Sequence, residues 1–243
     1  MHCSLRAFLL AAGLLPAATA LPALAQGIES SSGGAPEFDI VRAHVASEGD
    51  AVVFRMSVSG AAGSSKPTPS GQVAGSSVFS YVWPTSIDSG QVGFESGQGI
   101  LALAVTAHPD FDDTPREDED GNARADDDGG LWHSHWVVLV EDDACGPGAL
   151  KVRDIPEGAK PKLPETWPGL PILIDSPGYP PAIGDSVVEV RVPGAAIGAA
   201  RGASYDAVTA ALRVNADMHA PLLCVVDVFD VASGDLSLPG RIE

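Results

Sequence analysis

The chain has 243 residues and a formal net charge of −18 at pH 7, from 32 acidic residues against 14 lysines and arginines. Such an acidic surface repels nucleic acid and anionic lipid, so it argues against nucleic acid as a partner and favours cations. Glycine (27) and proline (20) are abundant while aromatic residues make up only 6%, a composition typical of many short strands joined by turns.

Residues 1–25 have the pattern of a secretory signal peptide. Arg6 precedes a short apolar core at 7–15, and the Ala-Leu-Ala motif at 23–25 is a small-x-small cleavage signal. We therefore expect a periplasmic or secreted protein whose mature chain begins at Gln26. Loss of Arg6 leaves 13 basic and 32 acidic residues, a formal charge of −19. No later run reaches the roughly 18 apolar residues that a membrane span needs.

Two cysteines, Cys145 and Cys224, remain after the expected cleavage, because Cys3 lies in the signal peptide. In an oxidising compartment an even pair predicts a disulfide. The competing interpretation is a pair of thiolate metal ligands, which export makes the less favoured of the two.

The first half of the mature chain predicts a hairpin and two further strands. Residues 26–36 are rich in serine and glycine and predict a flexible tether. Alternating apolar residues at 38–46 and 51–59, with a turn sequence between them, predict the hairpin. Residues 78–83 predict a short strand, and the continuous apolar run at 99–107 is typical of a buried strand.

The second half continues the same pattern. Strands are predicted at 131–140, 187–192, 207–216 and 222–231, with one helical turn within 194–202 and a proline-rich overlay at 156–181. There is no internal repeat and no composition shift that would mark a boundary. We therefore predict one domain, residues 37–243, with an all-β fold: an antiparallel β-sandwich, for which Greek-key connections are an option.

Ten acidic residues lie between positions 110 and 128, joining two predicted strands. Segments of this composition usually form solvated loops. A second interpretation is calcium binding, because Asp118, Asp120 and Asn122 have the one-three-five spacing of oxygen ligands in a calcium loop. The glycine at 121 and the lack of a glutamate at the twelfth position depart from the EF-hand pattern.

The segment Trp-His-Ser-His-Trp at 132–136 predicts a metal-binding arm. On a β-strand, side chains alternate between faces, so His133 and His135 share one face. Two imidazoles in this arrangement can bind one copper or zinc ion together.

Further ligands are expected from the neighbouring segments. Sequential strands usually pair antiparallel, which brings His108 level with about residue 132 or 133. His219 precedes the last strand, and the expected disulfide through Cys224 restricts its distance from the arm. The predicted ligands are thus His108, His133, His135 and His219. The neighbouring Met218 thioether favours copper, with zinc as second choice.

These residues resemble two known groups locally. A His-x-His arm, a later histidine and a disulfide that starts ten residues after the arm resemble Cu/Zn superoxide dismutase. Dismutase activity is not inferred, because no histidine lies between His135 and His219. Trp132 beside His133, ahead of the distant His219, is similar to the exported copper-binding proteins of methane-oxidising bacteria, and this similarity implies a histidine copper site.

The sequence therefore predicts an exported protein that holds one copper or zinc ion for capture or delivery, with a periplasmic protein as a candidate partner. The alternative is a calcium-stabilised β-sandwich module that binds a carbohydrate or a protein. No nucleophile motif or catalytic triad spacing is present, so the sequence favours a binding protein over an enzyme.

Overall fold

The computed structural model describes residues 27–30, 33–198, 200–216 and 221–243. The predicted signal peptide and His219 with its neighbour Met218 lie outside these residues. Among the residues described, no helix is long and apolar enough to cross a membrane. The helical segments are short 3-10 turns: η1 (Ser89–Val92), η2 (Asp143–Cys145) and η3 (Gly194–Ala196).

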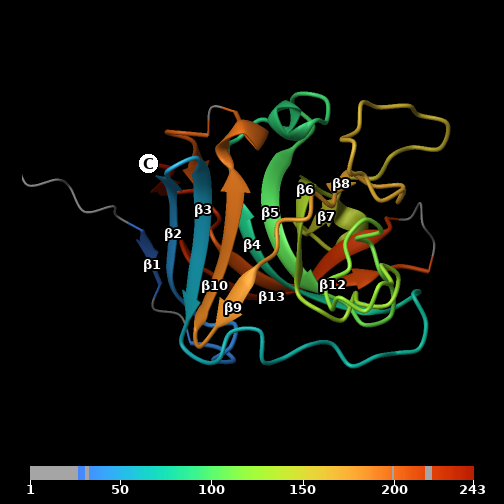
Figure 1. Cartoon of the computed structure of the whole chain (residues 1–243), viewed down its shortest axis with the longest axis horizontal. Coiled ribbons are helices and arrows are strands. Elements are labelled where there is room, and N and C mark those ends of the chain that lie inside the picture. Colours follow the sequence, from blue (N-terminus) through green and yellow to red (C-terminus); the bar gives the residue numbers. More distant parts are fainter. Residues whose placement is uncertain (1–26, 31–32, 199, 217–220) are drawn as a thin grey trace, which may run out of the picture.

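The prediction of an antiparallel all-β fold is confirmed, and one layer is a five-stranded sheet (Figure 1). Its order is β1 (Ile28–Glu29), β2 (Ile40–Glu48), β3 (Ala51–Val58), β10 (Val187–Pro193) and β9 (Ala182–Gly184). Alternation sets its faces: in β10, Val188, Val190 and Val192 are buried while Arg191 is exposed. The predicted hairpin is β2 and β3.

A two-residue strand lies within residues 26–36, the segment predicted to be a flexible tether. Ile28 pairs with Ala43 and Glu29 with Arg42 at the edge of the sheet. The two-residue strand is too short to carry a detectable alternation, so composition alone suggested a loop.

The second layer is a sheet that curls into a barrel. Its strands follow the order β5, β4, β12, β13, β7, β6, β8, and β5 also pairs with β6, which brings six strands into a ring. The bounds are β4 (Ser77–Pro84), β5 (Ile100–Ala107), β6 (His133–Glu141), β7 (Leu150–Val152), β8 (Ile174–Asp175), β12 (Val208–Val214) and β13 (Leu223–Val231). A small two-stranded sheet, β11 (Ser204–Tyr205) with β14 (Gly240–Arg241), completes the fold.

Strand β6 is buried on both faces because it lies between two apolar cores. Trp136 and Val138 face the core shared with the five-stranded sheet, where Trp136 meets Phe54 edge to face with centroids 6.0 Å apart. Such aromatic pairs add about 0.5–1.5 kcal/mol to area burial. Val137 and Leu139 face the barrel interior. By the same alternation, His133 and His135 also point into the barrel.

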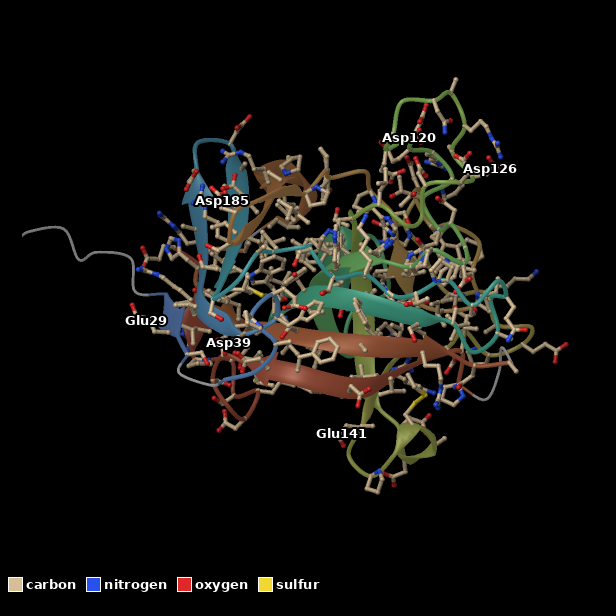
Figure 2. All side chains as sticks on the ribbon, turned by 90° about the horizontal axis from the view of Figure 1, so that it is seen from below. Glu29, Asp39, Asp120, Asp126, Glu141 and Asp185 are labelled. Carbon is tan, nitrogen blue, oxygen red and sulfur yellow. A yellow bond between two sulfur atoms is a disulfide. The ribbon has the colours of Figure 1, made fainter. Side chains whose placement is uncertain are left out.

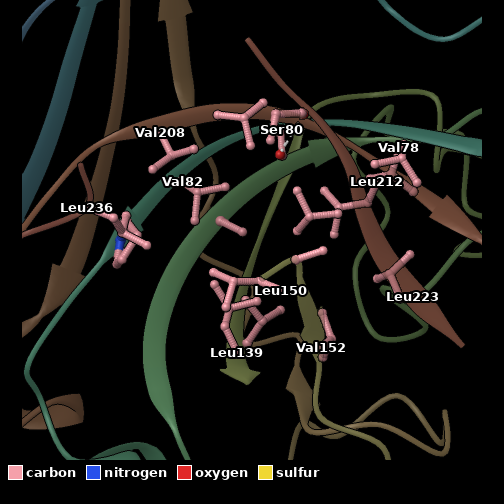
Figure 3. Close-up of a pocket in the computed structure, with 18 of the residues that line it drawn as sticks. Val78, Ser80, Val82, Leu139, Leu150, Val152, Val208, Leu212, Leu223 and Leu236 are labelled. Carbon is pink, nitrogen blue, oxygen red and sulfur yellow. Dashed lines mark hydrogen bonds between the residues drawn. The ribbon is translucent and has the colours of Figure 1, made fainter. Parts of the chain in front are cut away.

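The barrel interior is apolar and incompletely filled. It contains a cavity of about 360 Å³, and Figure 3 shows Val82, Leu139 and Leu212 among the residues that line it. Strand β13 meets β7 at a single residue pair, Cys224 with Lys151. The exposed Val228 lines the cavity on this strand, so the barrel is least closed beside β13.

The predicted disulfide is confirmed: Cys145 and Cys224 are bonded, with Cα atoms 5.5 Å apart and 79 positions apart in the sequence. Cys145 ends η2, which follows the carboxyl end of β6. The acidic loop precedes the amino end of the same strand. In Figure 2, Glu141 at the end of β6 and Asp120 in the loop therefore lie on opposite sides of the molecule.

Candidate metal centre

Two adjacent strands bring the histidines together. Strands β5 and β6 pair antiparallel as predicted, with Thr106 opposite His133 and Ala104 opposite His135. Both histidines occupy inward-facing positions of β6, at the end of the barrel where the acidic loop leaves β5. His108 lies one residue after the end of β5, so its imidazole reaches the same end.

Local contacts at the base of the acidic loop hold His108 in place. The His108 N–H donates to the Gly129 carbonyl at 2.8 Å, which closes the loop. The Phe111 ring stacks on the imidazole, with centroids 3.9 Å apart and planes 7° apart. Any side chain at position 129 would lie 1.9 Å from the Phe111 carbonyl oxygen, so this close approach requires glycine.

The carboxylate of Asp113 stands at the centre of the three imidazoles. Its Oδ1 lies 3.1 Å from Nε2 of His108 and 3.2 Å from Nε2 of both His133 and His135. The Nε2 atoms of His108 and His133 are 2.9 Å apart. All four side chains are buried, between 1% and 6% exposed. One donor atom from each therefore converges on a single point, a grouping that can hold a metal ion.

Hydrogen bonds at the far side of two rings determine which nitrogen faces this point. Nδ1 of His108 lies 2.9 Å from the Phe111 carbonyl oxygen, which only accepts, so Nδ1 carries the hydrogen. The Ser176 hydroxyl donates its single hydrogen to the Asp113 carbonyl at 2.6 Å. It must therefore accept from Nδ1 of His135, 3.1 Å away. In the neutral rings, both Nε2 atoms present bare lone pairs to the centre.

Lone pairs and a carboxylate that face one another at this range repel unless a cation lies between them. Burial alone would lower the pKa of His108, but the Asp113 carboxylate outweighs burial and raises it. Burial would also raise the pKa of Asp113, yet the surrounding imidazoles hold it well below its ordinary value. Burial lowers the pKa of His133 to about 4 despite the attraction of Asp113. The group thus favours a cation at its centre, either a proton or a metal ion.

Four of the six separations between the donor atoms can be compared with those around a small tetrahedral ion. Zinc–nitrogen and zinc–oxygen bonds of about 2.0 Å place tetrahedral donors about 3.3 Å from one another. The measured separations of 2.9–3.2 Å come close to this spacing. The Nδ1 atom of His108 contacts the Phe111 carbonyl, and Nδ1 of His135 contacts the Ser176 hydroxyl. These contacts orient the two rings, as is usual for metal-binding histidines.

A surface hollow of about 510 Å³ adjoins the group. His133 forms part of its wall, together with Glu117, Asp118 and Glu119. Lys66 lines it as well and donates to the Gly130 carbonyl at 2.6 Å. The three carboxylates attract cations to the side of the protein where the imidazoles lie closest to solvent.

Three of the four histidines expected to be ligands, His108, His133 and His135, come together, while the predicted fourth, His219, lies outside the described residues. The fourth donor found in the structure is Asp113, which sequence reasoning had counted only as one of ten acids. Its position five residues after His108, in the loop joining the two histidine-bearing strands, was the available signal. This signal does not single out Asp113, because Asp110 and Asp112 lie even closer to His108 in the sequence.

The predicted calcium ligands meet only in part. Asp118 and Asp120 group with Asp128, with one oxygen of each within 4.8 Å of the others. Asn122 is engaged elsewhere: its side-chain oxygen accepts from the Arg124 N–H at 2.8 Å, and its amide donates to Asp120 at 2.9 Å and to Asp127 at 3.2 Å. Asn122 also donates its backbone N–H to Asp118 and Asp120, so the three predicted calcium ligands lie together in a hydrogen-bonded turn, and calcium binding by them stays a prediction.

Comparisons with models of known protein families, with curated proteins and with solved structures found no match. The function is therefore argued from the geometry of this chain.

Proposed function

We propose that this protein is an exported metal-binding protein that captures one ion through His108, Asp113, His133 and His135. The observation that supports this most is that the Nε2 atoms of all three histidines lie within 3.2 Å of the Asp113 Oδ1 atom. Two of these nitrogens, from His108 and His133, also lie 2.9 Å from each other. Two of the imidazoles are held in the tautomer that a metal ligand requires.

We propose zinc as the first choice and copper as the second, which reverses the order favoured by the sequence. Three imidazole nitrogens and one carboxylate oxygen with near-tetrahedral spacing are a common zinc donor set. The expectation of copper(I) depended on the soft thioether of Met218, which lies outside the described residues. A carboxylate donor favours a divalent ion over copper(I).

The closed geometry supports capture and retention rather than catalysis. Catalytic zinc sites keep one position open for water or substrate, whereas here four protein side chains, at most 6% exposed, would fill all four positions around one ion. The acidic hollow beside His133 supplies an approach for cations. An oxidising compartment, consistent with the disulfide, fits a site built without thiolates.

Titration calorimetry with zinc and with copper, followed by metal analysis of the dialysed protein, tests this function. The wild-type protein is expected to retain one ion per chain, and a His133→Ala/His135→Ala variant to retain none. His44→Ala is a matched control, because His44 lies on β2 in the other sheet. Equal uptake by the wild type and the double variant would contradict the proposal.

A further inference from the structure

A second group of carboxylates surrounds Asp128 in the acidic loop. Asp128 is 3% exposed, and its Oδ2 accepts the Glu119 N–H at 2.5 Å. The carboxylates of Asp112 and Glu119 both lie within hydrogen-bonding reach of the Asp128 carboxylate. One oxygen each of Asp118 and Asp120 also approaches it, within 4.8 Å. Four acidic side chains from one loop thus surround a fifth, the buried carboxylate of Asp128.

Three oxygens of this group are buried without a hydrogen-bond donor: Oδ2 of Asp112, Oε2 of Glu119 and Oδ1 of Asp128. A buried carboxylate oxygen without a partner is strongly unfavourable. Carboxylates cannot satisfy one another while they are ionised, because each offers only acceptors. These oxygens therefore require a bound cation or protons.

The protein supplies no positive side chain to this group. Arg124, one of two arginines in the loop, pairs instead with Asp126 and Asp127, each at 3.2 Å. Among the described residues, no lysine or arginine forms a salt bridge with Asp112, Glu119 or Asp128.

We propose that Asp112, Glu119 and Asp128 bind a calcium ion, with Asp118 and Asp120 beside it. A site made only of oxygen donors selects a hard cation over zinc or copper. Calcium accepts six to eight oxygens in irregular geometry, which a loop can supply together with water, whereas magnesium demands a near-ideal octahedron. The sequence predicted a calcium site formed by Asp118, Asp120 and Asn122, whereas the central ligand of the site proposed here is Asp128.

The calcium site and the imidazole group are joined through the backbone, because Asp112 precedes Asp113 directly. Thr114 stabilises this step: its N–H and hydroxyl both donate to Oδ1 of Asp112, at 2.8 Å and 3.1 Å. Calcium bound by Asp112 would therefore fix the segment that carries Asp113 towards the histidines. We expect calcium to tighten zinc binding, and by linkage zinc to tighten calcium binding.

Calcium titration of the full mature protein, by calorimetry and by the shift in melting temperature, tests the site. Calcium is expected to bind once per chain and to raise the melting temperature more than magnesium does. Asp128→Asn should weaken calcium at least 100-fold, and Glu119→Gln is a second variant that keeps the loop backbone contact to Asp128. Asp126→Asn, at a carboxylate paired with Arg124, is the matched control and should bind as the wild type does.

Two results would overturn the proposal: no calcium binding beyond the level seen with magnesium, or equal calcium affinity in the wild type and both variants. Zinc titration of the same samples separates this proposal from the proposed function. If the protein binds zinc but not calcium, the calcium site is wrong and the proposed function stands. If it binds calcium but not zinc, the proposed function is wrong and the calcium site stands.

Discussion

The Nε2 atoms of His108 and His133 face each other at 2.9 Å inside the protein, although 25 residues of chain, most of them in the acidic loop, separate them. At this distance two neutral imidazoles with bare nitrogens would repel each other. Since Nδ1 of His108 carries its hydrogen towards the Phe111 carbonyl, the repulsion is relieved by a hydrogen on Nε2 of His133, by an added proton or by a metal ion.

Asp113→Asn should abolish tight zinc binding. The amide replaces the charge that lies 3.1–3.2 Å from all three imidazoles. Loss of a residue that only orients a ligand weakens metal binding about 10–100-fold, so loss of a direct ligand should exceed about 100-fold. Competition titration with a chromophoric chelator measures the change. Asp110→Asn, at a half-buried acid of the same loop that accepts from the Ser70 and Gly71 N–H groups, should leave the affinity unchanged.

Ser176→Ala should weaken zinc about 10–100-fold without removing a ligand. The hydroxyl accepts from Nδ1 of His135 and donates to the Asp113 carbonyl, so it orients two ligands at once. Ser134→Ala is the matched control, because Ser134 lies on the opposite face of β6 and donates to the Tyr179 carbonyl at 2.6 Å. If both variants bind zinc equally well, the tautomer argument fails.

Zinc affinity should rise as the pH increases from about 5 to 8, because the metal binds neutral imidazoles. Although burial opposes it, the attraction of Asp113 raises the pKa of His108 above that of a free histidine. His108 therefore keeps its proton, in the metal-free protein, to a higher pH than a free imidazole would. The affinity should still be rising above pH 6.5. In Asp113→Asn this part of the rise should shift to lower pH, and a flat profile in the wild type would contradict the prediction.

Reduction of the disulfide should destabilise the fold without emptying the metal site. Closing a loop of 79 residues is worth about 4 kcal/mol in the chain-entropy model. Cys145 follows the end of β6 that lies away from His133. A Cys145→Ser/Cys224→Ser variant is therefore expected to melt at a lower temperature and to bind zinc with unchanged affinity below that temperature. Loss of zinc binding in the folded variant would show that the two ends of β6 are coupled.

The sequence predicts the strands well where their pattern is strong. The buried run at 99–107 and the arm at 131–140 became β5 and β6, and antiparallel pairing brought His108 to the arm. Short strands escaped detection, because β8 and β9 have two and three residues and depend on neighbours for their conformation. The curling of one sheet into a barrel depends on the pairing of β13 with β7 at one residue, which no local pattern encodes.

The sequence predicts only those parts of the site that depend on local pattern. Alternation on one strand places His133 and His135 together whatever the rest of the fold does. The choice of Asp113 among ten acids depends on how the loop returns to β6, and on Ser176, which comes from 41 residues beyond His135. These contacts follow from the folded loop and not from spacing in the sequence.

X-ray absorption spectroscopy at the zinc edge tests the four-ligand site most directly. The zinc-loaded protein is expected to show four nitrogen or oxygen neighbours at about 2.0 Å, with outer-shell scattering from three imidazoles. The Asp113→Asn variant should lose this pattern. A six-coordinate, water-rich shell in the wild type, or scattering from fewer than three imidazoles, would contradict the site formed by His108, Asp113, His133 and His135.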